Sequence, residues 1–495
     1  MVDTIGKKGN QRTPEPLSKT VVKGGMWVFA LRIINRGLGF FRTIILARLL
    51  APEDFGLMGI AMLSIATLET FSQTGFQVAL IQKKENVQPY LDTAWTVSAI
   101  RGTILFIILF LAAPLIAKFF NSPEANLVIK VIAISTLVAG FRNIGIVFFQ
   151  KEMEFNKQFL YEISGTLVDL SVAVTLAFIL RDVWALVWGS LAGNLIRFFM
   201  SYVLQPYRPR INLEKDKIRD LFGFGRWVLG SSILVFLITQ GDDIFVGKLL
   251  GLAALGFYQM AYVLSNLPTT EITHVISQVT FPAYSKLQHD ILKLKKAYLK
   301  VLQLTAFISI PLAGGILVVA SDFTEIFLGL KWMPMVPAIQ VLAIAGLIRS
   351  IAATTGPIFH AIGKPRIDTF WQIIRLGILA LLIYPFSTNW GILGTSTAVL
   401  LSISVSTVGF SFEVIKITNC GKNNFLKMII LPLLNTIIMI LTLLLIKSIL
   451  PITSASILTI FILTGVTSYF LVAIAFDRIL NYGIYTVLKE SIESF

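Results

Sequence analysis

The amino-acid sequence predicts an all-α membrane protein with about 14 transmembrane helices. Of the 495 residues, 55% are hydrophobic and only 14% are charged, so the chain has more apolar surface than one soluble core can bury. Apolar runs of about 20 residues, which cross a hydrocarbon core of ~30 Å as a helix, recur from one end of the chain to the other. This pattern predicts a multi-pass membrane protein.

The predicted spans follow one another with short connections. They occupy residues 22–47, 55–80, 93–117, 126–149, 158–180, 183–204, 220–247, 253–283, 298–320, 336–361, 367–386, 390–413, 425–446 and 453–476. The residues before the first span are polar and basic and lead into a full-length span, so we expect no cleaved secretory signal. The short connections leave no room for a soluble catalytic domain.

Composition excludes several classes of function. Cys420 is the single cysteine, so no intramolecular disulfide can form, and the only histidines are His274, His289 and His360, too few for a metal-ligand cluster. The net charge of +15 comes from Lys and Arg that concentrate at the N-terminus, at the C-terminus and in the loops after even-numbered spans. Because basic residues are retained in the cytoplasm, both termini are expected there, and no nucleic-acid partner is expected.

A repeat runs through the chain. Residues 26–62 align with residues 226–262, which places Gly56 opposite Gly256, and a small slip then matches Glu69 with Glu271. Six spans per copy is an even number, so both copies enter from the same side and are related by an axis along the membrane normal. The expected organisation is a cytoplasmic segment (1–22), a six-helix bundle (23–204), a cytoplasmic linker (205–219), a pseudo-symmetric second bundle (220–413) across a central cleft, and two additional helices with a cytoplasmic tail (414–495).

The first span carries polar residues where lipid is expected. Arg32, Asn35 and Arg36 are spaced i, i+3, i+4 and share one helix face, whereas Arg42 lies roughly 80° away from Arg32 around the helix. A charge at the bilayer centre costs about 2.5–3.5 kcal/mol, so such residues face protein or water. This face is expected to line the cleft.

Two further spans carry polar stripes. Glu69, Gln73 and Gln77 are spaced i, i+4, i+8 on the second span, and Glu271, His274 and Gln278 are spaced i, i+3, i+7 on the eighth. The carboxylates and His274, with the pair Asp242 and Asp243 on the seventh span, are candidates for coupling to a proton or sodium ion. His274 is equally compatible with a hydrogen bond between packed helices.

Arginines outnumber carboxylates within the spans. The remaining charges are Arg101, Arg142, Asp169, Arg197, Arg349 and Arg375. Even if every acid pairs with an arginine, a positive remainder persists, which favours an anionic cargo. Salt bridges and snorkelling are the competing interpretations, and snorkelling is favoured for Arg142, Arg197 and Arg375 because they lie near predicted span ends.

Four segments resemble a known family. They are ILARLLAPEDFGLMGIA (45–61), TGFQVALIQ (74–82), GFYQMAYVLSNLP (256–268) and FPAYSKLQ (281–288). With the repeat, they resemble the polysaccharide transporter branch of the multidrug/oligosaccharidyl-lipid/polysaccharide exporter superfamily, in particular its Wzx-type lipid-linked oligosaccharide flippases. The resemblance covers essentially the whole chain.

The resemblance implies a flippase of the cell (inner) membrane that moves an undecaprenyl pyrophosphate-linked oligosaccharide by alternating access, for O-antigen, capsule or exopolysaccharide biosynthesis. Its cationic cavity would map onto Arg32 and Arg36, with support from Arg101 and Arg349. The full substrate-binding set would be Arg32, Asn35, Arg36, Arg101, Arg349, Gln73, Gln77 and Gln278. Implied partners are the lipid-linked oligosaccharide, membrane lipids, and the polysaccharide polymerase and glycosyltransferases of the same pathway.

Three other functions remain as alternatives. A cation-coupled multidrug antiporter of the same superfamily would prefer an acidic, aromatic cavity, whereas the charges here are net positive. A membrane-embedded glycosyltransferase or polymerase would need acidic residues on long outer loops, and the outer loops are short, so no enzyme activity and no cofactor are expected. A non-transporting assembly scaffold would not need charges inside its spans.

Overall fold

The computed structural model describes residues 17–73, 75–83 and 87–480, although within its helices the side chains of 17–26, 28–29, 78, 82, 220–229, 231, 267–279 and 480 lie outside the description. The described residues form helices and no strand. Eight of these helices are long and apolar enough to cross a membrane, or nine if one bent pair counts as a span. The all-α membrane fold is confirmed, and the count of 14 spans stays a prediction.

The chain forms two compact units. Unit 1 comprises residues 1–46, 68–112 and 129–230, and unit 2 comprises residues 47–67, 113–128 and 231–495. Each boundary falls inside a helix, so several long helices contribute residues to both units. These helices are α1 (Leu17–Leu49), α2 (Pro52–Phe71), α4 (Gln88–Phe119), α5 (Ala125–Ile132) and α10 (Lys215–Leu249). The two predicted six-helix bundles, with boundaries at 23–204 and 220–413, stay predictions.

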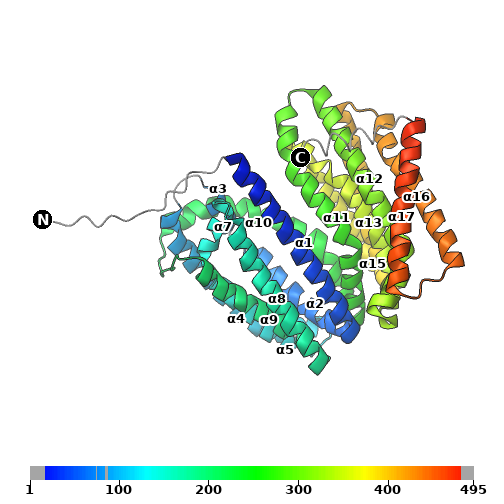
Figure 1. Ribbon diagram of the computed structural model, residues 1–495. Coiled ribbons are helices and arrows are strands. Elements are labelled where there is room, and N and C mark those ends of the chain that lie inside the picture. Colours follow the sequence, from blue (N-terminus) through cyan, green and yellow to red (C-terminus); the bar gives the residue numbers. More distant parts are fainter. Residues whose placement is uncertain (1–16, 74, 84–86, 481–495) are drawn as a thin grey trace. The chain divides into compact units, whose positions relative to one another are not determined.

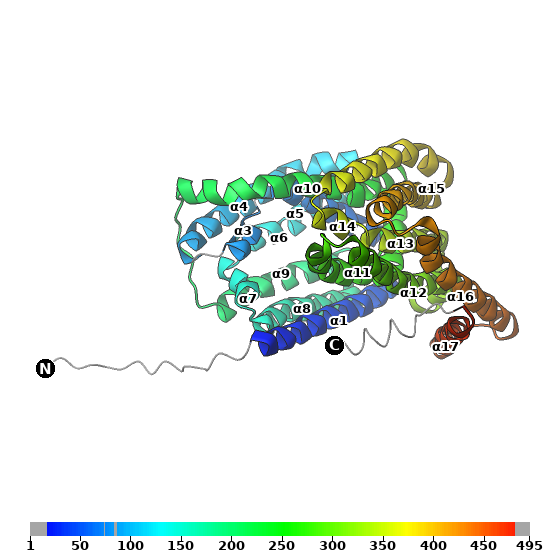
Figure 2. The same ribbon diagram turned by 90° about the horizontal axis from the view of Figure 1, so that it is seen from above.

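Unit 1 is organised around α8 (Phe155–Leu180) and α9 (Trp184–Leu204), which pack along much of their length. Glycines allow this close approach: a Cβ on Gly189 would lie 2.5 Å from Ala173 Cβ, and one on Gly193 would lie 2.8 Å from Gly165 O. Helix α1 lies beside α8 in both ribbon views (Figures 1 and 2).

Two predicted spans of the first repeat are broken helices. The span predicted at 55–80 ends as α2 at Phe71 and resumes as α3 (Phe76–Gln82) after Gly75, whose φ of 69° suits glycine. The span predicted at 126–149 divides into short pieces: α5, α6 (Ile134–Gly140), η1 (Ile144–Ile146) and α7 (Val147–Lys151), with a bend of 71°. At this bend the Asn143 side chain accepts a hydrogen bond of 2.9 Å from Gly145 N and caps η1.

Unit 2 contains the second half of the chain. Its elements after α10 are α11 (Leu252–Leu287), α12 (Ile291–Phe323), η2 (Thr324–Leu328), η3 (Leu330–Met335), α13 (Val336–Ala353), α14 (Gly356–Ala361), α15 (Pro365–Thr418), α16 (Lys422–Ile449) and α17 (Ala455–Leu480). Helix α15 joins the spans predicted at 367–386 and 390–413 through a kink at Gly391, whose φ of 58° and ψ of −139° are not helical.

Repeat-related glycines make a reciprocal contact within unit 2. A Cβ on Gly56 would lie 2.1 Å from Leu252 O, and a Cβ on Gly256 would lie 2.0 Å from Pro52 O. The aligned repeats pair Gly56 with Gly256 and Pro52 with Leu252, so the two contacts are copies of one another. A two-fold relation between the repeats requires this reciprocity. The starts of α2 and α11 therefore touch backbone to backbone.

Adding one methyl group at this crossing is expected to destabilise the protein. In Gly256→Ala, the new Cβ cannot coexist with a backbone oxygen 2.0 Å away, so α2 and α11 must separate, at a cost of about 1–3 kcal/mol. Thermal unfolding of the purified protein measures the loss. Gly377→Ala in α15 is the control, because no atom lies within 4 Å of its new Cβ. Equal unfolding temperatures for the two variants would show that the crossing adapts freely.

Residues 331 and 332 cap the carbonyl end of α1. Lys331 Nζ donates hydrogen bonds to Arg48 O at 3.0 Å and Leu50 O at 2.6 Å, and Trp332 Nε1 donates to Ala47 O at 2.8 Å. These donors satisfy carbonyls that have no partner within the helix, and the lysine charge complements the helix dipole. The last turn of α1 is thereby held in unit 2.

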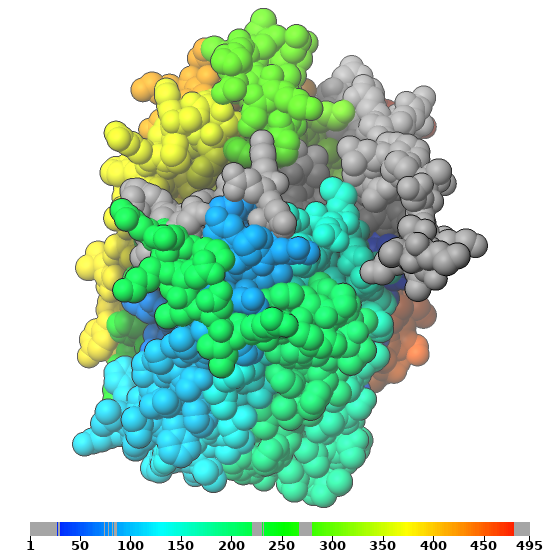
Figure 3. All heavy atoms as spheres, turned by 90° about the vertical axis from the view of Figure 1, so that its left-hand side faces the viewer, coloured from blue at the N-terminus to red at the C-terminus, as the bar shows by residue number. Residues whose placement is uncertain are grey.

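The linker after α9 is anchored to unit 1. The Asp92 carboxylate accepts hydrogen bonds from the Tyr207 hydroxyl and from Arg210 N, the latter at 2.9 Å, and Asn212 N donates to Thr96 Oγ1 at 3.0 Å. Figure 3 shows this green segment against the blue residues at the start of α4. The segment is part of the packed unit.

Candidate functional site

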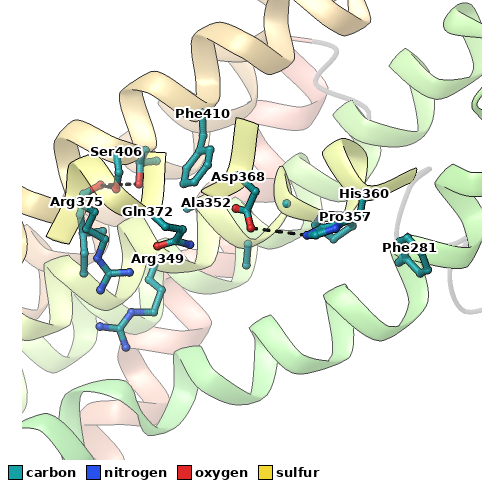
Figure 4. A pocket seen from close by; sticks show the side chains of 14 residues that line it. Phe281, Arg349, Ala352, Pro357, His360, Asp368, Gln372, Arg375, Ser406 and Phe410 are labelled. Atoms are coloured by element: carbon teal, nitrogen blue, oxygen red, sulfur yellow. Dashed lines mark hydrogen bonds and ion pairs between the residues drawn. The ribbon is translucent and has the colours of Figure 1, made fainter. Parts of the chain in front are cut away.

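A polar pocket of about 590 Å³ lies inside unit 2, between α11, α13, α14 and α15. Its polar lining residues are Arg349, His360, Asp368, Gln372, Arg375, Ser406 and Thr407. Figure 4 shows Arg349 and Arg375 side by side, with Gln372 between them and Asp368. At the other end, His360 Nε2 lies 3.7 Å from Asp368 Oδ2. Among the described residues, the pocket thus has a cationic end and an end where the Asp368 carboxylate already has His360 as a partner.

The two arginines differ in their contacts. Arg349 Nη1 donates to Asn266 Oδ1 at 3.1 Å, and its guanidinium lies 5.4 Å from the centre of the Tyr262 ring. No described residue hydrogen-bonds to or forms a salt bridge with Arg375, and its Nε is buried without a partner. Arg375 lines an internal pocket, so the snorkelling that its place in the sequence favoured does not describe it.

Two adjacent carboxyl groups, Asp242 and Asp243, lie on α10, and the first of them interacts electrostatically with these arginines. The buried Asp242 accepts a hydrogen bond of 2.6 Å from the Tyr258 hydroxyl, and its charge acts on both Arg349 and Arg375. Asp243 Oδ1 is buried without a hydrogen-bond partner. Two neighbouring carboxylates repel one another, so this pair is suited to holding a proton or a cation.

In unit 1, α1 contains Arg32, Asn35 and Arg36, the three residues predicted to share one helix face. Arg32 is half-buried and no described residue pairs with it, while Asn35 Oδ1 is buried without a partner and Arg36 is exposed. Arg42 differs, because its Nη2 lies 2.9 Å from Asp169 Oδ1 on α8, in a salt bridge with both side chains largely shielded. One helix thus carries both an arginine without a partner among the described residues and an arginine with a structural role.

Arg101 has a structural role. Its Nη2 donates to Glu69 O at 2.9 Å and its Nε donates to Ser72 Oγ at 3.0 Å, so it caps the C-terminal end of α2. The predicted stripe of Glu69, Gln73 and Gln77 is not one helix face, because α2 ends at Phe71. Only Glu69 belongs to α2. Its carboxylate lies within electrostatic range of Arg101.

Two other arginines have partners within unit 1. Arg142 donates to Asn194 Oδ1 at 2.5 Å, and Arg197 lies 3.6 Å from Glu162 Oε2. A Cβ on Gly165 would lie 2.6 Å from Arg197 Cγ, so the glycine leaves room for this side chain. Instead of the snorkelling that the sequence favoured for both arginines, Arg142 forms a hydrogen bond to α9 and Arg197 forms an ion pair between α9 and α8.

Three further predicted residues lie on the eighth predicted span. Glu271, His274 and Gln278 lie in α11, and their side chains are among those outside the description. Their roles in substrate binding and coupling stay predictions.

Comparison with known proteins identifies the family of this chain. Residues 45–337, more than half of the sequence, match the family model described as "Polysaccharide biosynthesis protein". The chain belongs to this family. The family resemblance that was based on segments such as residues 45–61 and 256–268 is therefore confirmed.

Two proteins with similar sequences have names that state a role. The chain is 27% identical over 402 residues to the lipopolysaccharide biosynthesis protein WzxC of Escherichia coli K12, covering 81% of this chain and 82% of that protein. It is 24% identical over 364 residues to the succinoglycan biosynthesis transport protein ExoT of Rhizobium meliloti, covering 73% and 74%. These relatives are named for biosynthesis and transport.

The fold is that of a solved flippase. This polysaccharide biosynthesis protein superimposes on lipid II flippase MurJ in an inward closed conformation with a TM-score of 0.76 and 17% identity, covering 93% of this chain and 99% of that one. At this identity the likeness establishes the fold alone. It confirms that the chain is an all-α membrane protein.

Proposed function

We propose that this polysaccharide biosynthesis protein is a flippase for an isoprenoid (undecaprenyl) pyrophosphate-linked oligosaccharide in the cell membrane, with both termini in the cytoplasm. The observation that carries the proposal is the presence of arginines inside apolar helices that form no salt bridge with a carboxylate in the described part of the chain. Arg32 in unit 1 and Arg375 in unit 2 are the clearest cases. A cation-coupled multidrug antiporter would not need this positive surplus.

The chemistry of the cargo accounts for these charges. A pyrophosphate cannot cross hydrocarbon unescorted, and guanidinium groups bind phosphate oxygens through paired hydrogen bonds. A polyprenyl tail needs no polar site, because it stays in lipid while the headgroup moves. Alternating access with the proposed cationic set, Arg32, Arg36 and Arg349, would carry the headgroup across.

Deleting the gene tests the proposal. The deletion strain is expected to accumulate undecaprenyl-linked oligosaccharide on the cytoplasmic leaflet and to lose the exported polysaccharide, and the wild-type gene should restore both. Lipid extraction with mass spectrometry, together with surface glycan staining, measures the two effects. Normal export in the deletion strain, with no accumulated intermediate, would reject the flippase.

Coupling is proposed at the pair Asp242 and Asp243, with Glu69, Glu271 and His274 as further candidates. Asp243→Asn removes a carboxyl group with a buried unpartnered oxygen and is expected to make export insensitive to the coupling gradient. Export is measured in vesicles with imposed proton or sodium gradients. Glu325→Gln, an exposed site in η2, is the control. Wild-type gradient dependence in both Asp242→Asn and Asp243→Asn would place coupling elsewhere.

A further inference from the structure

The pocket of unit 2 contains an arginine that no predicted binding set included. We infer that Arg375 and Arg349 form a binding site for a phosphate or diphosphate group at the cationic end of this pocket. The inference rests on the proposed function, because it names the place in unit 2 where the cargo headgroup would bind. Arg375 is the principal ligand and Arg349 the second.

The geometry provides unused donors. Arg349 donates from Nη1 to Asn266 and also has a side-chain hydrogen bond with Tyr262, whereas Arg375 makes no hydrogen bond to any described residue. The two guanidiniums lie side by side in Figure 4 at the same end of the pocket. A phosphate group offers several oxygens on one centre, so it can accept from both forks at once.

The charges favour an anion at this point. The two arginines repel one another, and Asp242 is the carboxylate that acts on both of them. One oxygen of Asp242 already accepts from Tyr258 and the other from Asp243 N, the latter at 3.1 Å. Asp368 Oδ2 lies 3.7 Å from His360 Nε2 at the far end of the pocket. Among the described residues, Asp242 is the one carboxylate that acts on both guanidiniums, so a net positive charge remains at this end of the pocket.

The rest of the pocket suits a headgroup. Gln372, Ser406 and Thr407 supply neutral polar groups beside the arginines, and Phe281 and Phe410 supply apolar surface. A volume of about 590 Å³ is in the range of sites that enclose a small ligand. The same phosphate chemistry is offered by a lipid-linked diphosphate and by free pyrophosphate, so the experiment must separate these two sources.

The test measures ligand binding to the purified full-length protein. Undecaprenyl pyrophosphate is titrated and followed by native mass spectrometry, with undecaprenol as the uncharged ligand. Arg375→Gln and Arg349→Gln are each expected to weaken undecaprenyl pyrophosphate binding by about ten- to a hundredfold and to leave undecaprenol binding unchanged. Arg366→Gln is the matched control, because Arg366 is exposed at the start of the same helix α15.

Inorganic pyrophosphate separates the two sources. If it displaces the lipid from the wild type but not from Arg375→Gln, the site binds phosphate whatever its carrier. If it does not compete while the arginine dependence holds, the site binds the headgroup of a lipid. Wild-type affinity in both Arg375→Gln and Arg349→Gln would overturn the inference.

A structural role for Arg375 makes a different prediction. If the arginine only neutralises Asp242, Arg375→Gln should lower folded protein, and the second change Asp242→Asn should restore both folding and affinity, which would also overturn the inference. The gene deletion is independent of these results. If the deletion strain loses export but Arg375→Gln binds the lipid as the wild type does, only this site is rejected. If binding depends on the arginines but the deletion strain exports normally, only the flippase function is rejected.

Discussion

Replacing both Arg32 and Arg36 by alanine is expected to abolish glycan export while folded protein in the membrane stays near its wild-type level. The two positions share one face of α1, and Arg32 has no partner among the described residues. Each lost pair of hydrogen bonds to a phosphate is worth about 1.5–3 kcal/mol, or roughly ten- to a hundredfold in affinity. Each variant is expressed in the deletion strain, and its glycan export is measured relative to the amount of variant protein in the membrane.

Lysine and a neighbouring arginine provide the controls. Arg36→Lys should restore export only in part, because lysine carries the charge without the planar pair of donors. Arg42→Ala on the same helix should instead lower folded protein, since it leaves Asp169 without its partner at 2.9 Å. Normal export by the double alanine variant at normal expression would exclude the cargo-binding role. The role would also be excluded if replacing a carboxylate in the double alanine variant restored both its folded protein level and its export.

Trp332→Ala is expected to cause the largest loss of stability, about 3–5 kcal/mol. Trp332 is fully buried, and its ring meets Phe55 at 5.2 Å and Phe257 at 5.8 Å between centres, both edge to face. The substitution leaves a cavity between α2 and α11 and removes the donor to Ala47 O. Thermal unfolding of the purified protein, with the fraction recovered as a single species on size exclusion, measures the effect.

Two further variants separate the ring from its N–H group. Trp332→Phe keeps most of the packing and should cost about 1–3 kcal/mol, the penalty for a buried carbonyl that loses its donor. Trp390→Ala is the matched control, because Trp390 is 59% exposed. An unfolding temperature for Trp332→Ala equal to that of Trp390→Ala would show that the contacts of Trp332 add nothing to the stability of the protein.

The sequence by itself determined the membrane fold and the family, and it predicted the repeat. Transfer of an apolar helix into lipid depends on its own side chains, so hydropathy alone locates spans without knowledge of their neighbours. The alignment of residues 26–62 with residues 226–262 needs no coordinates either, and it predicted that Gly56 and Gly256 are equivalent. Their reciprocal backbone contacts agree with that alignment. The shared face of Arg32, Asn35 and Arg36 follows from helical periodicity in the same way.

Only the tertiary structure decided which buried charges are already paired. Arg42 meets Asp169 across 127 positions of sequence, and Arg197 meets Glu162 across a helix crossing, and neither pairing follows from spacing along one helix. The stripe predicted through Glu69 failed for a local reason, since the helix stops before Gly75. The sequence placed Arg375 near a predicted span end, where a long side chain reaches water, but the fold places it in a pocket beside Arg349. The interaction energy of a buried charge depends on every charge around it, and those neighbours come from helices that the chain brings together only when it folds.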